Sequence, residues 1–509
     1  MESSRGVPRL APLVAALAFA CAPAGETPEP PRPLRIAVHS GPLSLDPHFK
    51  NEVLTYSILS NVYETLTDFG ANMRLRPALA ERWENPDDVT WRFVLRSGVL
   101  FHDGRELTAA DVVASLERAR AHPGSNFSSY LVAVDEIRAV GERTVEITTG
   151  RPYPILLNKL AFVAIVPADA PMDGEIRRPV GTGPYRLAAF RPPSQEVEGT
   201  VELAAFDGYR SAPAAEPRVE FVAVADPGER LARLLRGEVD VAHQLRPEEV
   251  ERLAEAECCR ALSRDSLLVE YLSLRTGVAP FSDPRVRQAI DLAIDRRRLV
   301  GEALREQGEP LGQMAGINIF GYDPEIEPPA RDLERARALL AAAGYPDGLD
   351  LEVELRFGRR FEELGEQLAE AGIRVTARAR PWPEMYRRLH ADEVDFYLGG
   401  VLAITADASD IFDSLVHSRD PARGYGQSNF LAYSNPELDR WIEESGRNLD
   451  MLDRRSTLQR GMRLVAEDRG YIALYAPRIL YGVGRGVDWQ PRSDGMLIAY
   501  EMRRSGDPG

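Results

Sequence analysis

The chain has 509 residues, more than one ordinary domain holds, so we expect two or three compact units. Its hydrophobic content of 44% and charged content of 28% are typical of a folded globular protein and exclude wholesale disorder. A formal net charge of -16 argues against nucleic acid or anionic lipid as the main partner, because phosphate groups bind to basic surfaces. The 62 basic residues include two lysines, Lys50 and Lys159, a bias that we attribute to genomic composition.

The amino terminus has the features of an export signal. Arg5 and Arg9 precede an apolar run over residues 10–20, which ends in small residues. A positively charged start, a short apolar run and small residues before the cut predict a signal peptide over residues 1–20. The run is too short to span a bilayer, which takes about 20 apolar residues.

Cys21 directly follows these small residues, as in a bacterial lipobox. We predict that Cys21 is lipidated and becomes the first residue of the mature protein, anchoring it to the membrane. Leu17 departs from the lipobox pattern by lying one place further from the cysteine than usual. The alternative is a plain signal peptide followed by a chance cysteine. Residues 21–33 are rich in Pro, Ala and Glu and are predicted to form a flexible tether.

The other two cysteines, Cys258 and Cys259, are adjacent. Adjacent cysteines do not reach ordinary disulfide geometry without strain, so we expect no structural bridge between them. We interpret them as two small, partly buried residues.

Beyond the tether, helical and strand patterns alternate, which predicts an α/β architecture. Residues that favour helix starts precede five of the helical patterns; they are Thr108 with Asp111, Asp226, Asp283, Asp332 and Asn435. Pro at the next position strengthens three of these starts. Gly237 and Gly344 are predicted to end two of the helices.

Glycines mark two further local features. Asp103-Gly104 is predicted to form a tight turn between an apolar strand and the helix that starts after Thr108. Gly181 and Gly183 flank Thr182 just before a strand, and we predict that their backbone has positive φ.

One short pattern occurs twice. In 231–242 and in 386–398, apolar residues three apart on a helix lead into Glu-Val-Asp and an apolar strand. The spacing to the aspartate, Asp240 or Asp395, is the same in both. Chance is one explanation, and two similar α/β lobes with one copy each is the other.

The stretch TWRFVLRSGVLFHDGRELTAADVVASLER (90–118) resembles the signature of the dipeptide/oligopeptide-type extracellular solute-binding proteins, family 5, of ABC importers. Further segments match that family in its order along the chain: SLDPH (44–48), NVYETLT (61–67), PALAERWE (77–84), PVGTGPYRL (179–187), FSDPRVRQAIDLAIDRRRLV (281–300), ARALLAAAGYPDG (336–348) and YSNPELDRWI (433–442). Together they cover nearly all of residues 34–503.

The resemblance implies a two-lobed periplasmic-binding-protein fold, type II-like, with an extra subdomain inserted in the first lobe. Lobe I would comprise residues 34–276 and 479–503, with the subdomain at about 55–177, and lobe II residues 277–478. The implied function is that of an extracytoplasmic binding lipoprotein, which captures a small ligand, in the first instance a peptide, between its lobes. The implied partner is the permease of an ABC importer, and we expect a monomer without a cofactor.

Within lobe II, the segment TADASDIFDSLVHS (405–418) matches the place where peptide-binding members carry an aspartate that pairs with the ammonium group of the ligand. The residue at that place is Asp407, with Thr405 as a neighbouring candidate. An enclosed carboxylate is costly unless it is paired, and a bond to an ammonium group would stabilise it. The alternative is that Asp407 or Ser409 caps the helix that follows.

One departure from the family bears on the ligand. Peptide-binding members usually carry a Trp shortly before this aspartate, whereas residues 401–405 read Val-Leu-Ala-Ile-Thr. The loss of an aromatic wall weighs against a peptide. From the first lobe we predict two ligand contacts: Ser40, near the end of the first strand, and Tyr130, whose ring combines apolar area with a polar group.

Catalytic motifs are missing from the sequence. It has no Gly-Lys-Ser/Thr phosphate loop, no G-x-S-x-G, no H-E-x-x-H and no C-x-x-C, and its seven histidines show no close metal-ligand spacing. We therefore predict a binding protein, not an enzyme, with no metal site. Two alternatives stay open: a sensor or chaperone-like lipoprotein that works without an importer, and a ligand such as an oligosaccharide or a metal complex.

Overall fold

A computed structural model describes residues 1–2, 32–194, 197–356 and 361–505. Residues 33–509 form one compact unit. The predicted signal peptide, Cys21 and nearly all of the tether lie outside the described residues. Among the helices that the structure describes, none combines the length and the apolar character needed to cross a membrane.

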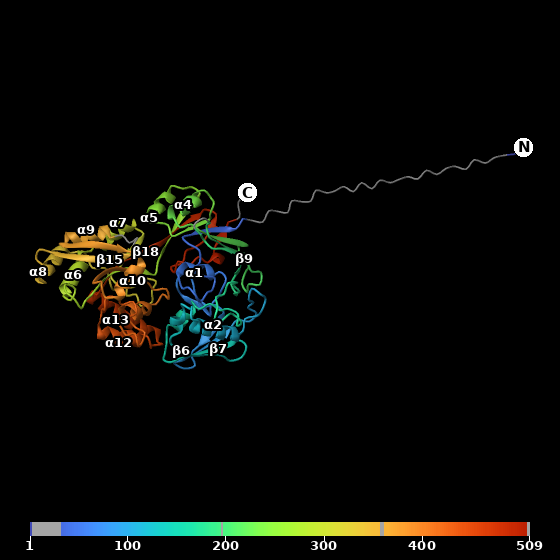
Figure 1. The fold of residues 1–509 in the computed structure, drawn as a ribbon, viewed down its shortest axis with the longest axis horizontal. Coiled ribbons are helices and arrows are strands. Elements are labelled where there is room, and N and C mark those ends of the chain that lie inside the picture. Colours follow the sequence, from blue (N-terminus) through green and yellow to red (C-terminus); the bar gives the residue numbers. More distant parts are fainter. Residues whose placement is uncertain (3–31, 195–196, 357–360, 506–509) are drawn as a thin grey trace. The chain divides into compact units, whose positions relative to one another are not determined.

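A mixed sheet of twelve described strands runs through the unit (Figure 1). Its main path, from one edge to the other, is β16 (Ile373–Arg380), β15 (Leu349–Arg356), β17 (Phe396–Leu402), β13 (Leu268–Leu274), β18 (Tyr471–Gly484), β11 (Val241–His243), β1 (Leu34–Val38), β10 (Arg218–Ala223), β9 (Thr200–Ala205) and β8 (Tyr185–Arg191). The other two strands, β12 (Cys259–Asp265) and β14 (Gly308–Pro310), also pair with β18.

The long strand β18 joins two halves of this sheet. Up to Pro477 it pairs with β13 and β14, and from Arg478 onward it pairs with β12 and β11. We call β1, β8 to β12 and the end of β18 the first half-sheet, and the remaining strands the second half-sheet. The first lobe is the part of the unit built on the first half-sheet together with residues 53–177, and the second lobe is the part built on the second half-sheet.

The predicted lobe boundaries can be compared with these pairings. The boundary at residues 478/479 lies beside the change of partners within β18. β13 comes before the predicted boundary at residue 277, yet it pairs with β17 in the second half-sheet. The exact bounds of the lobes stay a prediction.

Each half-sheet has its own apolar core. The central strand β1 is parallel to both β10 and β11, and all but one of its residues are buried, as expected for a strand covered on both faces. α4 (Pro227–Leu235) and α5 (Pro247–Ala254) belong to this half. The helices of the second half are α6 (Pro284–Ala293), α7 (Arg296–Leu304), α8 (Leu333–Ala342), α9 (Glu362–Glu370) and α10 (Trp382–His390). This alternation of helices and strands confirms the predicted α/β class.

A separate antiparallel sheet lies within residues 80–149. Its strands, in spatial order, are β4 (Ala80–Glu84), β5 (Thr90–Leu95), β7 (Thr144–Thr149) and β6 (Val134–Ala139). Alternate residues of β5 are buried, so one face of this sheet carries a core of its own, beneath α2 (Ala109–Ala121). These elements fall inside the segment predicted to form an inserted subdomain, which itself stays a prediction.

The remaining described elements complete the two lobes. They are α1 (Val53–Leu59), β2 (Thr67–Phe69), β3 (Leu75–Pro77), η1 (Ser128–Leu131), α3 (Leu156–Leu160), α11 (Ala408–Ile411), η2 (Phe412–Val416), α12 (Pro436–Ser445), α13 (Met451–Asp468), β19 (Val487–Asp488), η3 (Ala499–Glu501) and β20 (Arg503–Arg504). Of these, η1 and η3 are 3-10 turns, whereas η2 is a π-helical turn.

The predicted helix starts are confirmed at all five places. The side chains of Asp226, Asp283, Asp332 and Asn435 each accept a hydrogen bond from a backbone N–H in the first turn of their helix. At α2 the Thr108 backbone N–H donates to the Asp111 carboxylate at 2.8 Å. These contacts satisfy N–H groups that have no partner within the helix.

The prediction that the backbone has positive φ at Gly181 and Gly183 is wrong. Neither residue is among the described glycines with positive φ, whereas Gly104 in the predicted turn has a φ of 87°. A Cβ at Gly181 would lie 2.1 Å from the carbonyl oxygen of Val62, and one at Gly183 would lie 2.7 Å from the same oxygen. Glycine is required here because the backbone of another segment passes too close for a side chain.

Cys258 and Cys259 are both free thiols, but Cys258 is exposed and Cys259 is buried, so the interpretation of both side chains as partly buried is wrong. The repeated pattern falls on equivalent structures, since α4 leads into β11 of the first half-sheet and α10 leads into β17 of the second. The copies therefore belong to different lobes, as the second explanation of the repeat requires.

Candidate functional site

The segment after β17 builds one wall of the candidate site. Ala406 has a φ of 54°, a left-handed conformation that is uncommon for a residue with a side chain. The chain turns there and enters α11, where the backbone N–H of Ser409 donates to the Asp407 carboxylate at 3.0 Å. The helix-cap alternative for Asp407 is therefore confirmed.

Asp407 also has a charged partner. Arg454 of α13 donates from both terminal nitrogens to the two carboxylate oxygens, at 2.7 and 2.8 Å. Both side chains are buried, with exposed fractions of 3% and 1%. Burial raises the pKa of Asp407, but the Arg454 guanidinium and the bonds from Ser409 outweigh this effect and lower the pKa below its usual value. The predicted contact of Asp407 with a ligand stays a prediction.

Thr405 lies at the contact between the lobes. It is fully buried, and its hydroxyl donates to the Asp410 carboxylate. Its carbonyl oxygen accepts a hydrogen bond of 2.9 Å from the Asn158 side chain, which belongs to α3 in the first lobe. Thr405 therefore connects Asp410 in the second lobe to α3 in the first lobe through hydrogen bonds.

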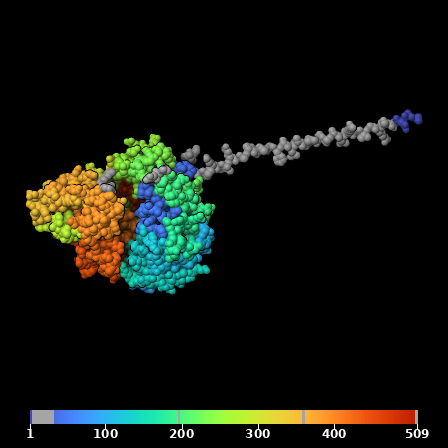
Figure 2. All heavy atoms as spheres, viewed as in Figure 1, coloured from blue at the N-terminus to red at the C-terminus, as the bar shows by residue number. Residues whose placement is uncertain are grey.

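Charged and polar side chains from both lobes meet around this point. The Lys159 ammonium in the first lobe lies 2.5 Å from the Asp410 carboxylate in the second. Nearby, Arg151 donates to the hydroxyl of Tyr425 at 3.1 Å. In Figure 2 the teal surface around residues 100–150 meets the orange-red surface of residues after 410. We call Arg151, Asn158, Lys159, Thr405, Asp410, Asp413 and Tyr425 the inter-lobe cluster.

Tyr130 belongs beside this cluster. Its ring centroid lies 5.0 Å from the Lys159 ammonium, a cation–π distance, and 5.8 Å from the ring centroid of Phe162. Burial raises the pKa of the Tyr130 hydroxyl, so the group is a neutral donor at physiological pH. Lys159 and Asp410 thus link Tyr130 to Thr405, and Asp407 lies two residues further along the chain, paired with Arg454. Ser40 follows β1 in the first half-sheet and, in the described part of the chain, shares no hydrogen bond, ion pair or ring contact with the other three predicted residues.

Asp413 is the second carboxylate of the cluster, and the sequence analysis singled out neither it nor Asp410. It lies on the π-helical turn η2, one turn after Asp410, and is partly buried. Burial raises the pKa of Asp413 to about 7; Lys159 lowers it, and the like charge of Asp410 adds to the rise. Such turns are rare and occur often at functional sites.

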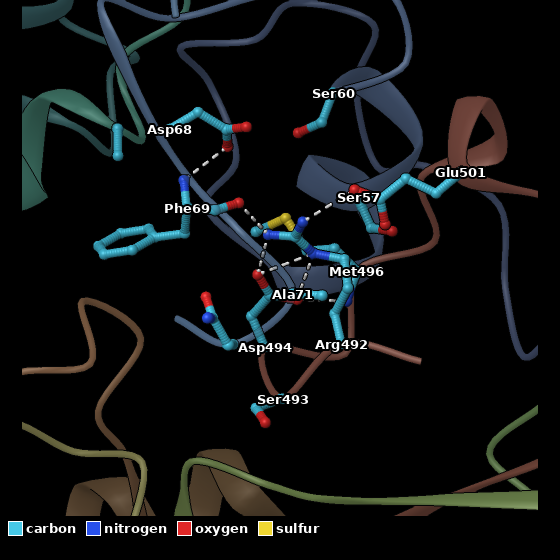
Figure 3. A network of polar contacts seen from close by, with 12 residues as sticks. Ser57, Ser60, Asp68, Phe69, Ala71, Arg492, Ser493, Asp494, Met496 and Glu501 are labelled. Atoms are coloured by element: carbon cyan, nitrogen blue, oxygen red, sulfur yellow. Dashed lines mark hydrogen bonds and ion pairs between the residues drawn. The ribbon is translucent and has the colours of Figure 1, made fainter. Parts of the chain in front are cut away.

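A separate cavity of about 610 Å³ lies in the first lobe. Figure 3 shows Arg492 at its wall, donating to the carbonyl oxygen of Phe69 at 2.8 Å and to Asp494 at 2.6 Å. All four carboxylates of its lining have arginine partners in the wall; the pairs are Asp494–Arg492, Glu501–Arg492, Asp68–Arg76 and Glu64–Arg210. Phe162 lines this cavity and also packs against Tyr130, so the cavity adjoins the inter-lobe cluster.

The sequence analysis did not identify several residues of the site. No sequence motif marks Arg151, Asp410, Asp413 or Arg454, and arginine is too frequent in this chain for a single one to be informative. Lys159 did have a signal, since it is one of two lysines among 62 basic residues. Among the described residues, no group of three or more His, Cys, Asp or Glu is arranged to hold a metal ion.

Comparison with known proteins decides the family. The model described as "Bacterial extracellular solute-binding proteins, family 5 Middle" matches residues 74–422. The chain belongs to this family. Its members are the solute-binding components of ABC importers, so the protein is an extracytoplasmic binding protein and not an enzyme. The predicted family is confirmed, and the sensor or chaperone-like alternative is not favoured.

Similar proteins cover most of the chain. The glutathione-binding protein GsiB of Pectobacterium atrosepticum is 29% identical over 470 residues, which are 87% of this chain and 88% of that protein. GsiB of Escherichia coli K12 is 27% identical, covering 87% and 89%.

Two solved structures share the fold. CtaP, an ABC transporter substrate-binding protein of Listeria monocytogenes, superposes with a TM-score of 0.84 at 20% identity, covering 93% of this chain and 99% of that one. DppA of Helicobacter pylori, in complex with the peptide STSA, has a TM-score of 0.77 at 23% identity and covers 93% and 98%. These likenesses confirm the two-lobed α/β fold.

Proposed function

We propose that this solute-binding protein is an exported lipoprotein that binds a short peptide or an amino-acid conjugate between its two lobes. The observation that carries the proposal is the contact between Lys159 and Asp410, which brings charges of opposite sign together from opposite lobes. A ligand with both ammonium and carboxylate groups complements a cleft that presents both signs of charge. An uncharged oligosaccharide cannot form ion pairs with these charged side chains.

The relatives support this ligand class. The GsiB proteins are named glutathione-binding, and the DppA structure holds a peptide. The chain spans nearly the full length of these relatives, so the comparison applies to the whole binding unit.

The arrangement of the cluster suggests how capture works. A ligand that touches both lobes binds the closed form better than the open form, and shifts the equilibrium between them by that difference in affinity. Arg151 and Lys159 reach the contact from one lobe, Asp410 and Asp413 from the other. The closed, loaded protein then docks on the permease of the importer.

The proposal of a membrane anchor rests on the sequence pattern of residues 1–33, which precede the folded unit. We propose that residues 1–20 are removed as a signal peptide, that Cys21 carries the lipid, and that residues 21–33 hold the binding unit close to the membrane. A single acyl chain binds a membrane only marginally, so more than one chain is needed for a stable anchor. A monomer is sufficient, because both sides of the cleft come from one chain.

A thermal-shift screen of residues 33–509 tests the proposal, with glutathione, di- to pentapeptides, maltotriose and a nickel–histidine chelate as probes. A ligand at 100 times its dissociation constant adds about 2.7 kcal/mol to the stability of the folded state. We expect glutathione or a peptide to raise the midpoint of unfolding. A shift with maltotriose or the chelate alone would contradict the ligand class.

A further inference from the structure

The cavity of about 610 Å³ in the first lobe is built by that lobe alone. Its lining lies between residues 56 and 96, between 161 and 211, and between 492 and 503, and so includes no element of the second half-sheet. The contact between Lys159 and Asp410, in contrast, needs both lobes. A volume of this size is typical of sites for small organic molecules. A molecule in this cavity would bind without bridging the lobes.

Part of the cavity wall is aromatic. Tyr56, Phe69 and Phe162 are buried side chains of the lining, and the ring centroid of Phe162 lies 5.4 Å from that of Tyr56 and 5.9 Å from that of Phe69. The Tyr56 hydroxyl donates to the carbonyl oxygen of Ala161 at 2.8 Å, so its polar group is satisfied within the protein. In Figure 3 the Phe69 carbonyl points toward Arg492 and the Phe69 ring points away from it. The three rings therefore offer apolar area to a bound molecule.

The charged side chains of the lining do not balance. It contains five arginines and four carboxylates, and no lysine or histidine. Each of the four carboxylates lies within 3.3 Å of an arginine of the wall. The other two arginines, Arg96 and Arg503, have no carboxylate partner among the described residues. The lining thus has an excess of one positive charge and two guanidinium groups without an acidic partner.

Arg96 is fixed in position without being neutralised. Its Nε donates to the carbonyl oxygen of Ala78 at 2.6 Å, and its terminal nitrogens have no protein partner in the described part of the chain. The backbone of Arg503 pairs with Asp488 in the small sheet of β19 and β20. Its side chain is exposed and makes no hydrogen bond or ion pair with a described residue. Both guanidinium groups are therefore available to a carboxylate.

Contacts around the wall join these two arginines. Arg96 bonds to Ala78, and Arg76 lies two residues before Ala78. The Arg76 guanidinium is 4.0 Å from the carboxylate of Glu501, which lies two residues before Arg503. Arg96 and Arg503 therefore belong to the same side of one cavity.

We propose that this cavity is a second binding site, for a small organic anion with a planar apolar body. Its carboxylate is held by Arg96 and Arg503, and its body packs against the rings of Tyr56, Phe69 and Phe162. A guanidinium binds a carboxylate through charge-assisted hydrogen bonds, and the apolar body gains from leaving water. The site goes beyond the proposed function, because it lies outside the contact between the lobes.

The lining disfavours other classes of ligand. A cation would meet carboxylates that are already paired with arginine, together with the excess positive charge. A neutral molecule of the same shape would gain no ion pair from the two free guanidinium groups. A small inorganic anion could pair with these groups but would leave the aromatic wall unused. A monoanion with an apolar body complements both features at once.

The cavity adjoins the inter-lobe cluster through one ring. Phe162 lines the cavity, and its centroid lies 5.8 Å from that of Tyr130, whose own centroid is 5.0 Å from the Lys159 ammonium. An anion could therefore bind at Lys159 instead. A test of the cavity must separate these two positions.

Isothermal titration calorimetry on residues 33–509 tests the site. The probes are indole-3-acetate, indole-3-acetamide and tryptamine, which carry one ring with a negative, a neutral and a positive side chain, and acetate, which has no ring. Arg96→Gln and Arg503→Gln each remove one guanidinium group, and Ser211→Trp fills part of the cavity from an exposed position of its lining.

Arg374→Gln is the matched control, because Arg374 is exposed and pairs with Asp350 at 2.6 Å on the second half-sheet. Lys159→Met reports on binding between the lobes. The midpoint of thermal unfolding shows that each variant is folded. Arg503→Gln keeps the test independent of stability, since the Arg503 side chain has no partner among the described residues to lose.

We expect the wild-type protein to bind indole-3-acetate at least about tenfold more tightly than the amide, tryptamine or acetate. Arg96→Gln and Ser211→Trp should weaken that binding by about tenfold, and Arg503→Gln, at an exposed position, by at least about threefold. Arg374→Gln should change it by less than about twofold.

Three outcomes would overturn the site. The first is that indole-3-acetate does not bind, or binds no more tightly than its amide. The second is that both arginine variants bind it as the control does. The third is that Lys159→Met loses the binding while the arginine variants keep it, which would place the anion between the lobes. The screen with glutathione and peptides is independent of all three, so the proposed function is tested separately.

Discussion

Arg454 and Asp407 form a bidentate ion pair that links α13 to α11, with nitrogen–oxygen distances of 2.7 and 2.8 Å. The pair is almost completely buried. Removal of one partner from a buried pair leaves an uncompensated charge, which costs about 3–5 kcal/mol. We predict a loss of this size in the free energy of unfolding for Arg454→Met, measured by urea denaturation at pH 7.

Two further variants serve as a control and as a second test in that experiment. Arg455→Met, on the exposed side of the same helix, should cost less than about 1 kcal/mol. The double variant Arg454→Met/Asp407→Leu should recover part of the loss, because no buried charge then remains. Equal stability of Arg454→Met and the wild-type protein would show that the pair contributes nothing to the fold.

Asp413 gives a pH dependence with a definite sign. Its pKa is about 7 in the folded protein and 3.8 for an ordinary aspartate, so between these values the folded state binds one proton more than the unfolded state. The contribution of Asp413 to stability therefore falls as pH rises from about 4 to about 7. We predict that Asp413→Asn is more stable than the wild-type protein at pH 8, and that this advantage shrinks at pH 5. Denaturant titrations of both proteins at the two pH values measure it, and an advantage that does not change with pH would contradict the raised pKa.

Lys159 and Asp410 are predicted to be coupled energetically. Each side chain is partly exposed, at 17% and 15%, so we expect a coupling of about 1–3 kcal/mol, between the values for surface pairs and for buried ones. A double-mutant cycle with Lys159→Met and Asp410→Asn measures it. The sum of the two single effects should exceed the effect of the double variant, and strict additivity would mean that the lobes are not held by this pair.

Gly181 should not tolerate a side chain. A Cβ there would lie 2.1 Å from the Val62 carbonyl oxygen, so the backbone must move. We predict that Gly181→Ala destabilises the protein by about 1–3 kcal/mol, as overpacking does. Gly277→Ala is the matched control, because no atom lies within 4 Å of a Cβ at that glycine. A midpoint of thermal unfolding for Gly181→Ala equal to that of the control would contradict the close approach.

Cys21→Ser tests the anchor. Without the thiol no lipid can be attached, so the full-length variant should leave the membrane fraction and appear in the soluble extracytoplasmic fraction. Fractionation of cells that express each form measures this. If the variant stays with the membrane, the proposed lipid on Cys21 is wrong.

The sequence was enough for features that depend on neighbours along the chain. Asp226, Asp283, Asp332 and Asn435 mark helix starts correctly, since each bonds to a backbone group within three residues. The cap at Asp407 is of the same kind, because its donor is the N–H of Ser409. The segments that match the family, in the family's order, were likewise enough to predict the family and its two-lobed fold.

The site depended on packing between distant segments. Asp407 was predicted as a ligand contact, but its ion pair with Arg454 exists only because α13 packs beside α11. The contact between Lys159 and Asp410 exists only because the two lobes meet. Gly181 is needed because the chain at Val62 passes close to it, not because of its own φ. Helix caps follow from local backbone geometry, whereas ion pairs and close backbone contacts follow from which elements the tertiary fold places side by side.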